Sequence, residues 1–120
     1  MNKIQNKLLR FYPICLTAVG VFIHFFGALK LFQPDVPQIS HLIMLIVDSL
    51  VVFALLRRSA WGYWLAILLY IQQSIMQPYW AYQNYLSTGA VYQLVLTSPL
   101  VIIALAILTM NKHLFVQENK

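Results

Sequence analysis

The feature that most constrains this chain is a set of four long apolar runs joined by short polar links. Each run is close to 20 residues, the length that an α-helix needs to cross the hydrocarbon core of a bilayer. The runs predict helices over residues 11–32, 39–57, 61–82 and 90–110. Because the links are short, consecutive helices should be antiparallel neighbours. The sequence therefore predicts an all-α integral membrane protein, a single domain over residues 1–120 folded as an up-down bundle of four transmembrane helices.

Composition supports lipid rather than water as the surroundings of this bundle. The 120 residues are 61% hydrophobic and 9% charged, whereas an ordinary soluble domain is about 25% charged. A small domain buries only about 60–70% of its surface, so lipid must cover part of the apolar side chains. Cys15 is the single cysteine, which excludes an internal disulfide and the paired cysteines of thiol-disulfide enzymes.

The basic residues lie at the ends of the apolar runs, which is typical of membrane topology signals and not of a nucleic-acid-binding face. In the predicted topology, seven of them lie on one side and only Lys30 lies on the other. Lys and Arg accumulate on cytoplasmic loops, so both termini are predicted to be cytoplasmic, in a bacterial inner membrane. The seven are Lys3, Lys7, Arg10, Arg57, Arg58, Lys112 and Lys120.

One carboxylate, Asp48, lies in the middle of the apolar run 39–56 and hence near the expected bilayer midplane. Placing an acid there costs about 2.5–3.5 kcal/mol on insertion scales, and such residues usually face the interior of a bundle and have a partner. Asp48 is therefore predicted to organise a polar cluster between the helices.

Polar side chains recur at helical spacing on the other three runs. In the first run, His24 shares a face with Gly20 and Gly27, and small residues let a neighbouring helix approach. Depths estimated from a rise of 1.5 Å per residue place these polar groups in the outer half of one bundle, around a cavity that opens outward. Pro78 and Pro99 are expected to kink their helices there. The candidate ligand-binding residues are His24, Asp48, Tyr70, Gln73, Gln77, Gln93 and Thr97.

A metal or haem site is not predicted. His24 and His41 differ in expected depth by about four residues, roughly 6 Å, whereas axial haem ligands should be nearly level. The sequence contains no HExxH motif and no Cys/His cluster. No catalytic constellation is present either, so the cofactor stays unidentified and an enzyme is the less favoured class.

The stretch over residues 20–34, GVFIHFFGALKLFQP, resembles the first helix of the DoxX-like small membrane proteins. An arginine-containing turn at Arg57 and Arg58 and a third helix that begins with Trp61 and Gly62 fit the same pattern. The resemblance implies a four-helix membrane protein, and in some members a link to sulfur or thiol redox chemistry and quinones. Paired cysteines are missing from this chain.

Several functions are consistent with these features. The first is a bundle that binds or moves a small molecule, a lipid or a quinone headgroup through His24 and Asp48. The second is a non-catalytic accessory or structural subunit, in which the same polar cluster fixes helix register. A quinone-linked redox protein and a toxin-neutralising immunity protein are further alternatives. The expected partners are the lipid bilayer, a small-molecule or lipid ligand, and a second copy or a larger membrane complex, with no nucleic acid.

Overall fold

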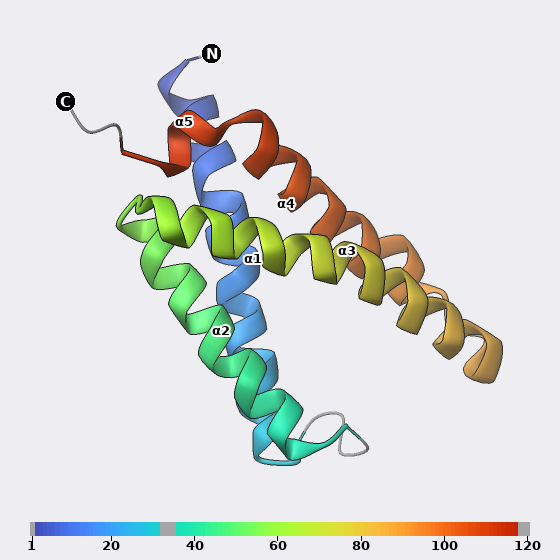
Figure 1. Cartoon of the computed structure of the whole chain (residues 1–120). Coiled ribbons are helices and arrows are strands. Elements are labelled where there is room, and N and C mark those ends of the chain that lie inside the picture. The colour runs from blue at the N-terminus through green and yellow to red at the C-terminus, as the bar shows by residue number, and fades with distance from the viewer. Residues whose placement is uncertain (1, 32–35, 118–120) are drawn as a thin grey trace.

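A computed structural model describes residues 2–31 and 36–117, and this part of the chain is helical and contains no strand (Figure 1). The all-α class is therefore confirmed. The predicted end of the first helix at residue 32, and the charge of Lys120, lie outside the described residues. The elements are α1 (Lys3–Ala28), α2 (Gln38–Leu56), α3 (Ala60–Thr88), the π-helix η1 (Gln93–Thr97), α4 (Ser98–Met110) and α5 (Lys112–Phe115).

The first helix begins well before its apolar run because a capping box closes its N-terminus. The Asn2 side chain accepts a hydrogen bond from the Gln5 backbone N–H at 2.8 Å, and the Gln5 side chain accepts one from the Asn2 backbone N–H at 3.1 Å. These bonds satisfy amides that otherwise have no partner at a helix start. The predicted boundary at residue 11 was wrong because hydropathy does not register such a polar first segment.

Two helices end in a left-handed residue that is not glycine. Lys30 follows α1 with φ of 62°, and Arg58 follows α2 with φ of 55°. After α2, the Arg58 N–H donates to Leu55 at 3.2 Å and the Ser59 N–H donates to Ala54 at 3.1 Å. This is the bonding pattern of a Schellman motif, which usually places glycine at the left-handed position. It turns the chain within a few residues, so α3 can begin at Ala60.

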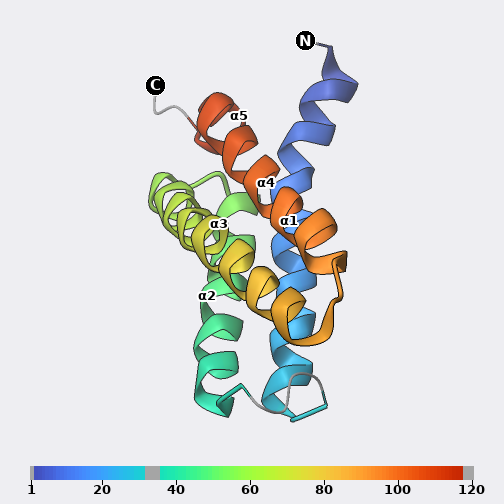
Figure 2. The same ribbon diagram turned by 90° about the vertical axis from the view of Figure 1, so that its right-hand side faces the viewer.

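The helices form two hairpins, with α1 packed mainly against α2 and α3 mainly against η1 and α4. The hairpins lie together near the two chain ends and diverge toward the end of α1 and the end of α3 (Figures 1 and 2). The shared core lies where they meet, with Leu55 of α2, Ala66 of α3 and Leu108 of α4 fully buried. Small residues such as Ala66 let the helix backbones approach closely at this point.

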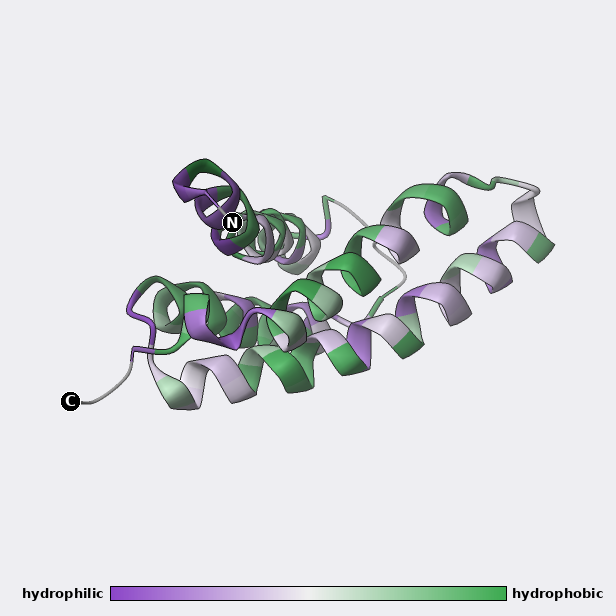
Figure 3. Ribbon diagram, turned by 90° about the horizontal axis from the view of Figure 1, so that it is seen from above, coloured by the Kyte–Doolittle hydropathy of each residue, from purple (hydrophilic) through white to green (hydrophobic). Residues whose placement is uncertain are grey.

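Within residues 2–31 and 36–117, three helical segments are long and apolar enough to cross a membrane: α1, α2 and the combined η1–α4 segment over 93–110. The third predicted span is different. Helix α3 is 29 residues long, but polar residues such as Gln72, Gln73 and Gln77 interrupt its apolar sequence, and Figure 3 shows alternating hydrophilic and hydrophobic bands along its ribbon. Large apolar side chains are exposed on the outer faces, including Phe22, Ile46 and Leu68, which are more than half exposed.

The short helix α5 was not expected from the sequence. It folds the chain back onto the link between α2 and α3, where the Phe115 side chain is fully buried. The Arg58 guanidinium donates to the His113 carbonyl at 2.9 Å, and the Gln117 N–H donates to the Arg58 carbonyl at 2.9 Å. The C-terminal segment is thus part of the folded unit.

Candidate functional site

A cavity of about 240 Å³ lies between α1, α3 and η1–α4, with one side chain contributed by α2. All seven residues predicted from helical periodicity line it, so the structure brings the whole predicted set together. They are His24, Asp48, Tyr70, Gln73, Gln77, Gln93 and Thr97. Gly20 and Thr17 of α1 and Tyr92 also line the cavity and were not among the predicted residues.

Asp48 is the contribution of α2, and it is 5% exposed. Its carboxylate faces Gly20 of α1: a Cβ placed on residue 20 would lie 2.7 Å from Oδ2, closer than real side chains approach. The His24 Nε2 lies 3.8 Å from the same oxygen. The missing side chain at Gly20 therefore makes the space in which the acid of α2 reaches the histidine of α1.

His41 contacts the site through His24, and it is not among the residues predicted from the sequence. Its Nδ1 lies 3.0 Å from the Nδ1 of His24, and its side chain is 1% exposed. The expected separation of about 6 Å in depth was wrong for the rings, because it counted backbone rise and ignored how far each side chain reaches along the helix. Gly27 is the sequence feature that goes with this pair, because only glycine leaves room for the His41 ring: a Cβ at residue 27 would overlap that ring.

The Tyr70 hydroxyl joins α3 to α1 at the inner wall of the cavity. Its single proton is shared between the Thr17 Oγ1, at 2.7 Å, and the Pro13 carbonyl, at 3.3 Å. The Thr17 hydroxyl also donates to the Pro13 carbonyl, at 2.6 Å. Tyr70 is 3% exposed. This network anchors the wall, and it leaves the glutamines as the more adaptable polar groups of the lining.

The glutamine amides of α3 bond to one another along the helix. The Gln77 side chain donates to Gln73 at 2.9 Å, and the Gln73 side chain donates to Gln72 at 2.8 Å. Across the cavity, the Gln93 amide donates to the Tyr92 hydroxyl at 3.3 Å. All of these are bonds between close neighbours in sequence, so a ligand can replace them without separating two helices.

The helix geometry before Pro99 positions Gln93 and Thr97, the last two of the predicted lining residues. Proline has no N–H, so a continuous α-helix would leave the Val95 carbonyl without its donor. The chain instead forms a π-turn over Gln93–Thr97, in which the Ser98 N–H donates to the Gln93 carbonyl. Such wide turns are common at functional sites. The expected disturbance at Pro99 takes this form, whereas Pro78 lies within the uninterrupted helix α3.

Charge in the cavity is confined to the α1–α2 side. Among the described lining residues, Asp48 and His24 are the groups that can carry charge near neutral pH, and neither Lys nor Arg is present. Residues 2–31 and 36–117 contain no group of three or more His, Cys, Asp or Glu side chains placed to hold a metal ion. The arrangement favours binding through hydrogen bonds and one carboxylate.

No known relative identifies this site. The chain matches no family model, no curated protein and no solved structure. The resemblance to DoxX-like proteins therefore stays a prediction.

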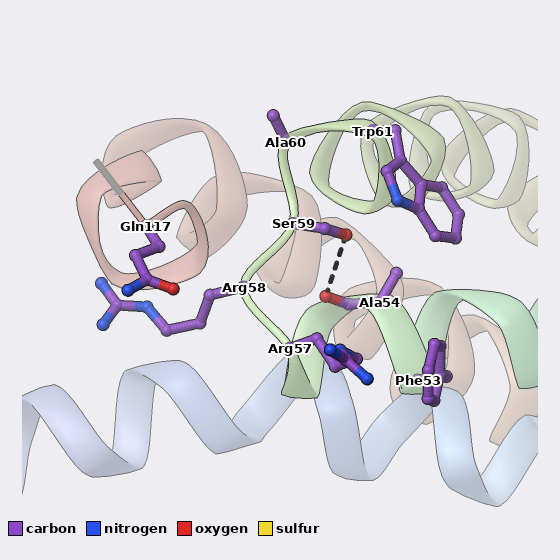
Figure 4. A pocket seen from close by; sticks show the side chains of 8 residues that line it. All are labelled: Phe53, Ala54, Arg57, Arg58, Ser59, Ala60, Trp61 and Gln117. Atoms are coloured by element: carbon purple, nitrogen blue, oxygen red, sulfur yellow. Dashed lines mark hydrogen bonds between the residues drawn. The ribbon is translucent and has the colours of Figure 1, made fainter. Parts of the chain in front are cut away.

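A second cavity, of about 330 Å³, lies at the C-terminal end of α2 and contains none of the predicted site residues (Figure 4). Its two arginines already have partners: Arg58 donates to His113, and the Arg57 guanidinium lies 5.4 Å from the centre of the Phe53 ring. Gln117 closes one side. This cavity is the place where the C-terminal segment packs against the link between α2 and α3.

Proposed function

We propose that this protein is a small integral membrane protein whose interior cavity binds or moves a small molecule or the headgroup of a lipid or quinone. The observation that carries the proposal is the convergence of polar side chains from all four long helical segments on one cavity. Intramembrane ionisable groups mark functional sites by default, and Asp48 and His24 lie together at this one.

The proposed placement in a membrane rests on the positions of the basic residues and on the exposed apolar side chains. Three segments have the length and hydropathy of a span. Helix α3 spans with them because its Gln73 and Gln77 line the cavity while Leu68 and Ile75, each 65% exposed, present an apolar surface to lipid. Basic residues gather at the end that carries both termini, and by the positive-inside rule this supports the proposal that this end lies in the cytoplasm of a bacterial cell.

The size of the cavity favours a small ligand or a headgroup. Pockets for drug-sized molecules usually measure about 300–1,000 Å³, and this one measures about 240 Å³. The amides of Gln73, Gln77 and Gln93 supply both donors and acceptors, and Asp48 supplies one charge. A polar headgroup would bind among these groups while any acyl or isoprenoid chain stays in lipid.

Native mass spectrometry of the protein extracted in mild detergent, with an absorption spectrum of the same sample, tests the proposal. We expect a co-purified small molecule or lipid that Asp48→Asn removes and that Ser49→Ala, on the exposed face of the same helix, retains. A quinone spectrum would connect the ligand to the DoxX-like resemblance. A ligand-free protein that travels only with a larger membrane protein would contradict the proposal in favour of the accessory subunit.

A further inference from the structure

Three titratable side chains form a continuous line across the α1–α2 contact: His41, His24 and Asp48. The two histidines meet through their Nδ1 atoms at 3.0 Å, and the other nitrogen of His24 lies 3.8 Å from the Asp48 carboxylate. His41 is in the first turns of α2, whereas Asp48 lines the cavity at the middle of the same helix. The line therefore runs from one helix end to the candidate ligand site.

The Nδ1 contact restricts where protons can be. At 3.0 Å there is room for one hydrogen between two ring nitrogens, and a hydrogen bond requires one nitrogen to donate and the other to accept. The two rings therefore cannot both carry an Nδ1 proton. The pair accepts at most one positive charge, and a change of tautomer in one ring forces the opposite change in the other.

Burial decides which ring donates in the resting state. The His41 Nε2 is buried and has no hydrogen-bond partner among the described residues. A buried N–H without an acceptor is rarer than a buried acceptor without a donor. The tautomer that this favours has the His41 proton on Nδ1, donated to His24. His24 then carries its proton on Nε2, the nitrogen nearer to Asp48.

We propose that these three residues are a proton relay, which carries a proton from the Nε2 of His41 to the carboxylate of Asp48 in the cavity. A proton binds the free Nε2 of His41, and the Nδ1 proton of His41 passes to His24. The Nε2 proton of His24 passes to Asp48. One proton enters and one carboxyl forms, and no group is oxidised or reduced. The His24–His41 hydrogen bond persists with its direction reversed. The last transfer requires the His24 Nε2 and the Asp48 carboxylate, 3.8 Å apart, to approach to hydrogen-bond distance.

The relay adds a mechanism to the proposed function. The ligand class inferred below rests on that proposed function. The relay switches Asp48 between charged and neutral, and the groups that face Asp48 and His24 from the other helices are neutral: Tyr70 from α3, and Tyr92 with Gln93 before α4. An ionised Asp48 in such a cavity attracts a small cation, and a protonated one releases it. The ligand class is thus a small organic cation that exchanges with a proton.

The ring protons can be observed without any ligand. Nitrogen NMR of the full-length chain, labelled at histidine in detergent micelles, distinguishes the two tautomers of each ring as pH is lowered. We expect His24 and His41 to exchange tautomers together over one pH range, and exposed His113 serves as the internal reference. Asp48→Asn should abolish the paired exchange. Independent titration of His24 and His41 in the wild-type protein would overturn the relay, even where the variant fails to fold.

The ligand class has its own test, with tetramethylammonium as the probe in calorimetric titrations. Its affinity should fall about tenfold per pH unit below the range in which the tautomers exchange, because one proton competes with one cation. Asp48→Asn should eliminate binding, and Ser49→Ala should not change it. Equal affinity on both sides of that range would overturn the cation assignment. The relay and the co-purified ligand are measured separately, so either can fail alone.

Discussion

Gly27 of α1 lies directly against the imidazole of His41 on α2, and a Cβ at residue 27 would overlap that ring. The same helix face carries Gly20 against Asp48 and, between the two glycines, His24. The close approach of α1 and α2 and the line of titratable groups therefore depend on the same missing side chains. A change in either glycine should affect both packing and the site.

Gly27→Ala is expected to destabilise the protein by about 1–3 kcal/mol, the usual cost of overpacking a close contact. The added methyl group must displace the His41 ring, so the His24–His41 hydrogen bond should be lost as well. Reversible unfolding in mixed detergent measures the first effect, and histidine nitrogen NMR measures the second. Cys15→Ala, at an exposed position of the same helix, should leave both unchanged. An unaltered histidine spectrum in Gly27→Ala would contradict this account.

Tyr70→Phe removes the hydroxyl that connects α3 to Thr17 and Pro13 of α1. Interhelical hydrogen bonds in membrane proteins average about 0.6 kcal/mol and reach about 1.7 kcal/mol, so a loss in this range is expected. A double-mutant cycle with Thr17→Val isolates the Thr17–Tyr70 coupling. Tyr92→Phe is the matched control, because its hydroxyl only accepts from neighbouring Gln93. Strict additivity of Tyr70→Phe and Thr17→Val would show that the bond contributes nothing.

Lys30→Gly should stabilise the protein. Lys30 has φ of 62°, and a left-handed conformation costs a non-glycine residue roughly 1–2 kcal/mol. Glycine also adds freedom to the unfolded chain, so the expected net gain is about 0.5–1 kcal/mol. The same substitution at exposed Lys7, inside α1, should instead destabilise by about 1 kcal/mol. Changes of the same sign at both positions would mean that charge, and not backbone conformation, controls the effect.

Phe115→Ala tests the docking of the C-terminal segment. Truncating a fully buried phenylalanine costs about 3–5 kcal/mol where the surroundings cannot relax, and less where a terminal segment can detach. We expect faster proteolysis after α4 with little change in the cavity around Asp48. Met110→Ala is the control, because Met110 is 80% exposed. Equal protection of the C-terminus in both variants would show that α5 is held by other contacts.

Much of this structure follows from local pattern. Runs of apolar residues are sufficient to predict four long helices, and the period of 3.6 residues is sufficient to place Tyr70, Gln73 and Gln77 on one face. An acid in the middle of an apolar helix must turn away from lipid, so Asp48 could be placed in the interior from the sequence alone. The cavity collects those residues because each helix has one polar face to bury.

What only the tertiary structure decided is which side chains from different helices meet. The His24–His41 contact depends on how far α1 and α2 slide and rotate against each other, and Gly20 and Gly27 control this through close contact. The docking of Phe115 likewise depends on a turn at Arg58 and a hydrogen bond to His113. Helical periodicity within one segment contains no information on its register against another. Packing between helices supplies that register, and with it the line of groups from His41 to Asp48.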